Sequence, residues 1–313
     1  MRTTVLVLGG SGMLGSMVVD TLARNPDLAV TATARTAALA ESCAGRVDVA
    51  WRVFDGDAPD LDAALALVDG QRWVINAIGI TKPLIRDDNA FEIERAIRIN
   101  GHLPHALARR AGAAGARVLQ IATDCVFSGA RGRYTETDPH DALDVYGKTK
   151  SLGEVWAPHV HHLRCSIIGP EPRDHKFLLD WFLGQPRGAE LNGFVNHDWN
   201  GVTTLHFAKL CEAVVMQDLA LPHLHHVVPT GSVTKADMLE LFAAAFGRQD
   251  VAVRRVTAGT TLDRTLATSQ ADLNRRLWDG AGYHEPPTVP RMLDELSRHP
   301  CRLREIQAPA AQR

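Results

Sequence analysis

Short apolar runs alternate with helical segments along the first half of the chain. The first run, Val5-Leu6-Val7-Leu8, is continuously apolar and stops at glycines, a pattern typical of a strand buried in a parallel sheet. A helix is expected next, from about Met13 to Arg24, and the alternation continues to about residue 169. Further strands are expected at 29–34, 49–54, 73–75, 117–122 and 161–169. This order predicts an α/β fold built on a doubly wound parallel sheet.

A glycine-rich turn lies between the first strand and the first helix. Its glycines at 9, 12 and 15 permit a tight turn, close approach of the backbone to a pyrophosphate, and close packing of the helix on the strand. The helix N-terminus then presents free amide groups and a partial positive charge to the phosphates. The turn therefore predicts a dinucleotide-binding fold of the Rossmann type. The expected cofactor contacts in it are Gly9, Ser11, Gly12, Met13, Leu14 and Gly15.

The end of the second strand indicates which dinucleotide binds. An NAD-specific site usually carries a carboxylate there for the ribose 2′-hydroxyl, whereas an arginine suits the 2′-phosphate of NADP. Arg35 occupies this position, so NADPH is the expected cofactor and NADH the alternative. A merely solvated arginine at a strand end would carry no such preference.

Residues after the third and fourth strands complete the expected cofactor site. Asp55 and Gly56 follow the third strand, where a carboxylate either reaches the adenine amino group or caps the next helix. Asn100 stands beside a glycine in a long helical region, where it either joins a water relay or marks a kink. The small residues expected under the nicotinamide ribose are Asn76, Ala77, Ile78 and Gly79.

Tyr146 and Lys150 are the leading candidates for catalysis. They stand four positions apart on a predicted helix and therefore share one face. A neighbouring ammonium stabilises a phenolate and is expected to lower the pKa of Tyr146, so that the phenol exchanges a proton with a substrate oxygen. The fifth strand delivers Thr123 and Asp124 to the edge of the sheet where such folds bind ligands. Together with the glycine-rich turn, this set predicts an oxidoreductase.

The alternation of strand and helix ends near residue 169. The expected dinucleotide-binding Rossmann domain comprises residues 1–169 and about 201–230, because a helix and a strand in the second range return to it. Residues of about 170–200 and 231–301 are expected to form a smaller, mostly C-terminal substrate lobe. The tail, 302–313, is expected to be loosely held.

Composition argues against several classes of function. The net charge of −2 gives no electrostatic reason to expect nucleic acid or an anionic membrane as a partner. No apolar run approaches the roughly 18 residues of a membrane helix. The 5 cysteines form no C-x-x-C pair, which favours reduced thiols in a cytoplasmic protein. The 14 histidines lack acidic or cysteine companions at ligand spacing, so no metal site is expected.

Several motifs together carry a family resemblance that covers nearly the whole chain. The motifs are residues 9–15, 76–79, 122–129, 134–136, 145–150 and 163–166. With them the chain resembles the extended short-chain dehydrogenase/reductases, and within these the dTDP-4-dehydrorhamnose reductase branch. The resemblance implies that Thr123, Tyr146 and Lys150 are catalytic and that Asp124 lies near the substrate. The implied substrate is a nucleotide-linked 4-keto-6-deoxy sugar.

Two departures from that branch leave the sugar open. Ile167 stands where rhamnose-type reductases tend to carry an aromatic residue, and residues 196–204 have no obvious counterpart in their substrate lobe. In this segment His197 and Asn200 are candidates for binding sugar hydroxyls, and Trp199 either stacks on the base or sugar or packs in the core. Arg264 is assigned to the diphosphate by charge complementarity alone.

The resemblance implies hydride transfer from NADPH to the keto carbon. Tyr146 would protonate the oxygen, Lys150 would hold the nicotinamide ribose, and Thr123 would hydrogen-bond the oxyanion. Epimerisation of a nucleotide sugar is an alternative, whereas dehydration is disfavoured because Cys125 stands where related dehydratases carry a glutamate. A second alternative is a non-catalytic dinucleotide-binding subunit, since the regulatory β-subunit of methionine adenosyltransferase resembles the same branch. The expected partners are the nucleotide sugar and, as an alternative to a monomer, a second copy in a homodimer.

Overall fold

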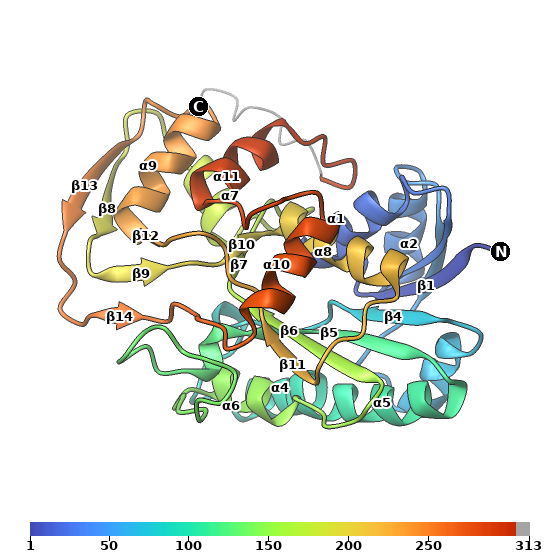
Figure 1. Ribbon diagram of the computed structural model, residues 1–313. Coiled ribbons are helices and arrows are strands. Elements are labelled where there is room, and N and C mark those ends of the chain that lie inside the picture. Colours follow the sequence, from blue (N-terminus) through green and yellow to red (C-terminus); the bar gives the residue numbers. More distant parts are fainter. Residues whose placement is uncertain (305–313) are drawn as a thin grey trace.

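A seven-stranded parallel sheet forms the centre of the computed structural model, which describes residues 1–304 (Figure 1). The strand order is β11-β6-β5-β4-β1-β2-β3, and every neighbouring pair is parallel. The predicted α/β fold with a doubly wound parallel sheet is therefore confirmed. The strands are β1 (Thr3–Leu8), β2 (Leu28–Ala34), β3 (Ala50–Val53), β4 (Trp73–Asn76), β5 (Arg117–Thr123), β6 (Val160–Cys165) and β11 (Leu224–His226).

Helices cover both faces of this sheet. One face carries α1 (Met13–Leu22), α2 (Ala37–Ala44) and α8 (Thr204–Gln217). The other carries α3 (Leu61–Ala64), α4 (Ala90–Ala96), α5 (Leu103–Ala114) and α6 (Val145–Leu152), with a π-helix, Ile97–His102, between α4 and α5.

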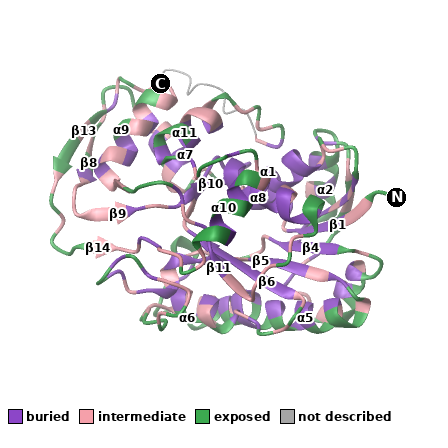
Figure 2. Ribbon diagram, viewed as in Figure 1, coloured by how far each residue is buried: buried purple, intermediate pink, exposed green. Residues whose placement is uncertain are grey.

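Side chains of β1 alternate between the two cores. Val5 and Val7 pack with α1 and α8, whereas Leu6 and Leu8 pack with α5. The neighbouring strands β5 and β6 are likewise mostly buried (Figure 2). Burial on both faces is the reason why β1 is apolar at every position rather than at every second one.

The chain leaves the central sheet at Ser166. The single strand predicted at 161–169 is wrong, because β6 ends at Cys165 and a separate strand, β7 (Ile167–Ile168), pairs with β10 (Val202–Thr203). The apolar run is continuous across this point, while the pairing partner changes from β5 to β10. β10 leads directly into α8, which packs against α1.

The remaining elements build the second half of the molecule. β8 (Glu190–Phe194) pairs with β13 (Ala252–Val256), and β9 (His197–Trp199) lies between β12 (Val233–Thr234) and β14 (Leu262–Asp263). The helices here are α7 (Leu178–Leu183), α9 (Lys235–Ala245), α10 (Ala271–Gly280) and α11 (Val289–Arg298). α10 packs against α8 and α11 against β10, so this half shares one hydrophobic core with the sheet.

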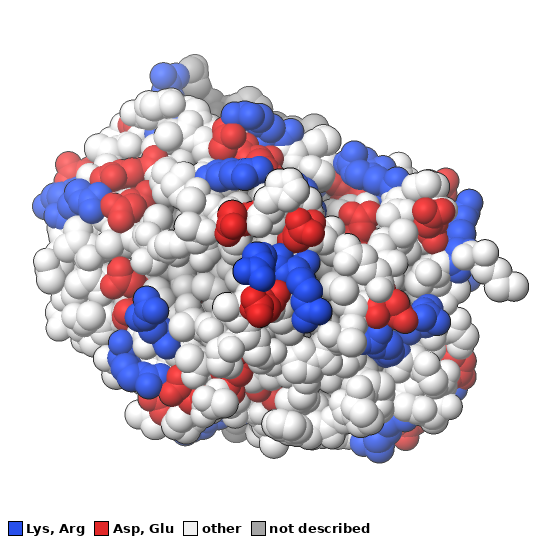
Figure 3. Space-filling view, viewed as in Figure 1, with Lys and Arg blue, Asp and Glu red and all other residues white. Residues whose placement is uncertain are grey.

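Charged side chains of both signs are interspersed over the face seen in Figure 3. Many of them are paired, as Arg254 is with Glu190 and Arg275 with Asp272. No helix among residues 1–304 is long and apolar enough to cross a membrane.

Residues 299–304, here called the C-terminal strap, tie the two halves together. Arg302 forms an ion pair with Asp20 on α1, and Arg304 forms one with Asp180 on α7. Both aspartates are buried. The strap therefore joins a helix that packs on the sheet to a helix of the second half.

The tail expected to be loosely held, 302–313, overlaps the strap at residues 302–304. Residues 302–304 belong to the strap and are held by the ion pairs of Arg302 and Arg304. The rest of the predicted tail lies outside the described residues. No local sequence pattern predicted these ion pairs, because the aspartate partners, Asp20 and Asp180, lie far from residues 302–304 in the sequence.

Asp20→Asn is expected to lower the free energy of unfolding by roughly 1–3 kcal/mol at pH 7, since Arg302 and His299 lose a charged acceptor. Burial raises the pKa of Asp20, but the hydrogen bonds from His299 and Arg302 outweigh it, and the pKa is lowered. A carboxyl with a lowered folded-state pKa stabilises the fold above its unfolded pKa, about 3.9, and this contribution is lost as the pH falls through the folded value. In urea unfolding, the difference between wild type and variant should therefore shrink below about pH 4.

Asp27→Asn provides the matched control, because Asp27 is exposed and follows shortly after Asp20. It should change the free energy of unfolding by less than about 0.5 kcal/mol. An Asp20→Asn protein as stable as wild type at pH 7, or a difference that grows in acid, would contradict the role given to the strap.

Candidate active site

A cleft of about 710 Å³ runs along the carboxyl ends of the central strands. It lies where the strand order reverses, at β1 and β4, the position at which folds of this kind bind ligands. The predicted site residues that line it are Gly9, Ser11, Gly12, Met13, Leu14, Arg35, Asp55, Gly56, Ala77, Ile78, Gly79, Thr123, Asp124, Tyr146 and Lys150. The predicted site residues that do not line it are Gly15, Asn76, Asn100, His197, Trp199, Asn200 and Arg264.

The glycine-rich turn leaves the N-terminus of α1 open toward the cleft. Gly12 is the N-cap residue, and no side chain caps the helix. The Gly9 amide donates to Thr33 Oγ1 at 3.0 Å, which fixes the turn against β2. Gly15 lets α1 pack closely against the turn, since a Cβ at this position would lie 2.0 Å from the Gly9 carbonyl oxygen. The uncapped amides at the start of α1 fit a phosphate group.

Arg35 lies directly after β2 at the exposed end of the cleft. It forms no ion pair within residues 1–304, so its guanidinium is available to an anionic ligand. The neighbouring Asp57 is already engaged, because Arg98 donates to it at 2.5 Å and Arg95 lies 3.7 Å away. The hydrogen bond from Arg98 is the largest cause that lowers the pKa of Asp57. Asp55, which accepts a hydrogen bond from the Asp57 amide at 3.0 Å, also lines the cleft.

Asn76 and Asn100 hold the loop after β4 and do not face the cleft. The Asn76 side chain donates to Gln120 and accepts from the Ile78 amide at 3.1 Å. The Asn100 side chain bonds both the amide and the carbonyl of Ile80, each at 2.9 Å. Asn100 lies in the π-helix, an irregularity at the position where a kink was the alternative, and its side-chain amide donates to the Ile80 carbonyl and to Thr149 Oγ1.

Helix α6 brings Tyr146 and Lys150 to the end of β5. Asp144 caps the helix by accepting from the Gly147 amide at 2.8 Å and is itself held by Lys82 at 2.7 Å. Gly147 permits the close approach, since a Cβ there would lie 2.5 Å from the Cys125 carbonyl oxygen. Lys150 Nζ donates to the Ile121 carbonyl oxygen at 3.1 Å.

The pKa values of Tyr146 and Lys150 move in opposite directions. Burial raises the pKa of Tyr146, the Cys125 thiol adds to the rise, and a hydrogen bond with Thr123 opposes it. Burial lowers the pKa of Lys150 to about 8, against the attraction of Glu154. The expected lowering of the Tyr146 pKa is therefore wrong for the protein's own groups, because loss of solvation is the largest influence on this pKa and raises it. The phenol is held in its protonated form.

Asp124 and Cys125 complete the reacting end of the cleft. Asp124 is 7% exposed and accepts a hydrogen bond from the Thr123 hydroxyl at 3.2 Å. Burial raises its pKa, against the opposing charges of Arg264 and Lys235. Burial also raises the pKa of the Cys125 thiol to about 12. A thiol that stays protonated is a poor base, which agrees with dehydration being the disfavoured reaction.

The second-half candidates for substrate binding are engaged within the protein. Trp199 is buried and donates to Ser166 Oγ at 2.8 Å, as expected for the core-packing alternative. Asn200 bonds both the amide and the carbonyl of Leu266, at 2.9 and 2.7 Å. His197 Nε2 lies 3.0 Å from the Thr260 carbonyl oxygen. Arg264 donates through Nε to the Phe127 carbonyl oxygen at 2.8 Å.

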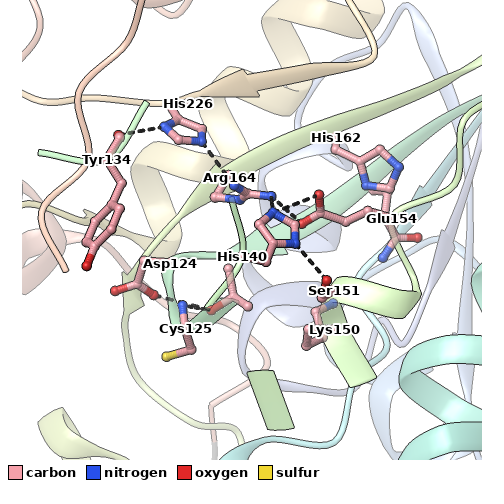
Figure 4. A network of polar contacts seen from close by, with 12 residues as sticks. Asp124, Cys125, Tyr134, His140, Lys150, Ser151, Glu154, His162, Arg164 and His226 are labelled. Atoms are coloured by element: carbon pink, nitrogen blue, oxygen red, sulfur yellow. Dashed lines mark hydrogen bonds and ion pairs between the residues drawn. The ribbon is translucent and has the colours of Figure 1, made fainter. Parts of the chain in front are cut away.

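Arg164, a fully buried arginine near the end of α6, was not singled out as a site residue by the sequence (Figure 4). Arg164 on β6 forms an ion pair with Glu154, which follows α6. It also donates to His140 Nε2 at 2.9 Å and to His226 Nε2 at 3.2 Å. The Phe127 ring lies 5.0 Å from its guanidinium carbon. In the sequence, Arg164 appeared only within the family motif 163–166, with no role of its own.

His226 is neutral in this network. Its Nε2 accepts from Arg164, so its Nδ1 carries the proton that reaches the carbonyl oxygens of Ala267 and Tyr134, at 2.9 and 3.1 Å. Burial and the charge of Arg164 lower the pKa of His226 to about 4, in agreement with this assignment.

A segment after β7 also lines the cleft without having been predicted. Arg173 donates to the Ser11 carbonyl oxygen at 3.0 Å, so this segment lies across the glycine-rich turn. Its base is anchored to Asp180, which accepts from the Glu171 amide at 2.6 Å. The C-terminal strap reaches the same aspartate through Arg304. Only the cluster of charges at 171–176 marked this segment in the sequence.

A second hollow of about 630 Å³ lies between α1, α8 and α11. It contains none of the predicted site residues, and the Lys209 and Glu295 side chains on its wall are paired with each other at 3.0 Å. Among residues 1–304 there is no group of three or more histidine, cysteine, aspartate or glutamate side chains that could hold a metal ion.

Arg164→Met is expected to lower the free energy of unfolding by roughly 3–5 kcal/mol in urea denaturation, since it leaves the Glu154 carboxylate buried without its cation. Substituting Glu154 by methionine in the same chain should recover part of the loss, because no lone charge then remains. The exposed pair offers a control: Arg275→Met should cost less than about 1 kcal/mol. Equal effects of Arg164→Met and Arg275→Met would refute the structural role of the network.

Comparison with known proteins identifies the family. The family described as RmlD substrate binding domain matches residues 2–170. A dTDP-4-dehydrorhamnose reductase of Streptomyces griseus is 37% identical over 154 residues, which cover 49% of this chain and 44% of that protein. Methionine adenosyltransferase 2 subunit beta of Danio rerio is 41% identical over 164 residues, covering 49% of this chain and 50% of that protein. The chain thus spans about half the length of the curated relatives it matches.

Solved structures share the fold over almost the whole chain. A dTDP-4-dehydrorhamnose reductase from Bacillus anthracis, in complex with NADP, superposes with a TM-score of 0.70 at 18% identity, covering 95% of this chain and 99% of that chain. The family match itself extends over more than half of the sequence and agrees with the resemblance carried by the motifs. The chain belongs to the RmlD substrate binding domain family, in the dTDP-4-dehydrorhamnose reductase-like branch of the extended short-chain dehydrogenase/reductases.

Proposed function

We propose that this protein reduces the keto group of a nucleotide-linked 4-keto-6-deoxy sugar, with NADPH as the cofactor. The observation that carries the proposal is that the half-buried phenol of Tyr146, whose pKa is raised, lines the same cleft as the glycine-rich turn. One cleft thus joins a site for a dinucleotide pyrophosphate to a proton donor. The relatives named dTDP-4-dehydrorhamnose reductase support the substrate class.

Each catalytic residue handles a proton or a charge. Tyr146 donates its proton to the substrate oxygen as that oxygen becomes an alkoxide. The Thr123 hydroxyl donates a hydrogen bond to the same developing charge. Lys150, with a pKa of about 8, stays mostly charged at neutral pH and holds the nicotinamide ribose. NADPH, when bound, supplies the hydride.

The remaining cleft residues fit the parts of the dinucleotide. The uncapped N-terminus of α1 binds the pyrophosphate. Arg173 lies over the same turn, where it donates to the Ser11 carbonyl oxygen. Arg35 binds the 2′-phosphate through its unpaired guanidinium. Asp55 is assigned to the adenine amino group, and residues 77–79 to the nicotinamide ribose.

A second candidate function is a non-catalytic dinucleotide-binding subunit. It is favoured by the 41% identity to methionine adenosyltransferase 2 subunit beta. An epimerase on the same fold would use the same cleft residues. Both alternatives differ from the reductase in a measurable way, because neither consumes NADPH in proportion to the sugar.

The test is the absorbance of reduced nicotinamide, followed with a panel of dTDP-, UDP- and GDP-4-keto-6-deoxy sugars. Stoichiometric oxidation of NADPH is expected with one of them. Tyr146→Phe should lower kcat by roughly 10²–10⁴-fold while leaving NADPH affinity near wild type, because only the proton donor is removed. Tyr134→Phe, a buried tyrosine that does not line the cleft, should keep wild-type turnover.

Two results would count against the reductase. A Tyr146→Phe protein that keeps most of the turnover would remove Tyr146 as proton donor. NADPH binding without oxidation by any sugar in the panel would favour the non-catalytic subunit, and interconversion of sugars without net oxidation would favour the epimerase.

Arg35→Ala is expected to raise the KM for NADPH by roughly 10–100-fold, since it removes a charge-assisted contact with the 2′-phosphate. The KM for NADH, which lacks that phosphate, should change by less than about twofold. Arg52→Ala provides the control, because Arg52 is an exposed arginine on β3 outside the cleft. An equal loss for both cofactors would show that Arg35 does not select NADPH.

A further inference from the structure

The segment after β7 places a cation at the glycine-rich turn. Arg173 donates through Nη2 to the Ser11 carbonyl oxygen at 3.0 Å, and both residues line the cleft. Ser11 directly precedes Gly12, the N-cap residue of α1. The Arg173 guanidinium therefore lies beside the uncapped helix N-terminus, where the free amides fit a phosphate group.

Arg173 forms no ion pair within the described part of the chain. Its contact with Ser11 uses only one of the guanidinium N–H groups. The buried carboxylates of the same segment are engaged elsewhere, since Glu171 accepts from the Phe177 amide at 2.6 Å. Asp180 likewise accepts from the Glu171 amide at 2.6 Å. The charge of Arg173 and most of its donors are therefore available to an anionic ligand.

The backbone after Arg173 is held in an unusual conformation. Asp174 and His175 have φ angles of 69° and 49°, in the left-handed region that residues other than glycine rarely adopt. The His175 amide donates to the Arg173 carbonyl oxygen at 2.9 Å, and the His175 ring lies 3.3 Å from the buried Asp180 carboxylate. A tight turn that fixes Arg173 is thus anchored to the protein interior. Backbone conformations of this kind cluster at ligand-binding sites.

We propose that Arg173 binds the pyrophosphate of the dinucleotide and holds it against the N-terminus of α1. The helix N-terminus alone offers roughly half a positive charge, whereas both phosphates are negative. A guanidinium adds a full charge and parallel hydrogen bonds to phosphate oxygens. This inference rests on the proposed function for the identity of the cofactor. It gives a cofactor-binding residue to the range 170–200, which the sequence assigned to the substrate lobe.

Other cations that line the cleft are placed differently. Arg35 directly follows β2, the position assigned to the ribose 2′-phosphate. Arg95 is paired with a carboxylate, and Lys150 donates to a backbone carbonyl oxygen. Lys176 belongs to the same segment as Arg173 but is exposed. The contact with the glycine-rich turn distinguishes Arg173 from these four side chains.

Isothermal titration calorimetry on the full chain tests the proposal with NADP, NAD and adenosine 2′-phosphate as probes. Arg173→Met should raise the Kd of NADP and of NAD by the same factor, roughly 10–100-fold, because both carry the pyrophosphate. The Kd of adenosine 2′-phosphate, which lacks the pyrophosphate, should change by less than about twofold. Arg173→Lys keeps the charge and should weaken the dinucleotides less than Arg173→Met. The melting temperature without ligand should stay near wild type, which separates lost binding from misfolding.

Two further variants separate the pyrophosphate from the other charges. Arg35→Ala should give the complementary pattern, with weaker binding of NADP and adenosine 2′-phosphate and unchanged binding of NAD, because only the first two carry a 2′-phosphate. Lys176→Met removes an exposed cation of the same segment. It should change each Kd by less than about threefold, because an exposed charge contributes little.

Failure of the inference differs from failure of the proposed function. Unchanged binding of NADP and NAD by Arg173→Met overturns only the inference, as does an equal loss with adenosine 2′-phosphate or in Lys176→Met. Dinucleotide binding that depends on Arg173, with no NADPH oxidation by any keto sugar, sustains the inference and overturns the reductase. A wild-type protein that binds neither dinucleotide overturns both.

Discussion

The burial of a full positive charge on Arg164 is the constraint on which the site depends. A guanidinium removed from water is tolerated only when acceptors surround it. Glu154, His140 and His226 provide these acceptors from three separate segments, the end of α6, the loop before it and β11 (Figure 4). The contacts of this one guanidinium therefore connect the end of α6 to β6 and β11. Lys150 lies in the last turn of α6, four residues before Glu154, and its Nζ donates to the Ile121 carbonyl oxygen.

Two close backbone contacts, each made possible by a glycine, shape the cleft. Gly147 lets α6 reach the carbonyl of Cys125, and Gly15 lets α1 reach the carbonyl of Gly9; in both places a Cβ would overlap an oxygen. The first contact brings Tyr146 to Thr123, and the second opens the helix N-terminus to phosphate. Asp180 then links the segment that crosses the glycine-rich turn to the C-terminal strap. The cover of the cofactor site and the strap are thus held by one buried carboxylate.

Local patterns predicted the sheet, the glycine-rich turn and the Tyr146–Lys150 pair, because each depends on residues near in sequence. What the sequence could not reveal depends on distant partners. The amide of Asn100 is occupied by Ile80, and the ion pairs of the strap need Asp20, at the other end of the chain. The end of β6 at Cys165 was not predicted for the same reason, since it is defined only by the change of pairing partner from β5 to β10.

Burial also bears on the direction of the chemistry. With its pKa raised, Tyr146 carries its proton at neutral pH, so it meets a substrate as a proton donor and not as a phenolate. Donation to an alkoxide is favourable, because an alkoxide is a much stronger base than the phenolate that remains. Even a tyrosine well above its usual pKa of about 10 gives its proton to such an oxygen. Epimerisation at the same residue needs both directions in each cycle. The desolvation of Tyr146 agrees with the proton-donor role that the proposed reduction gives it.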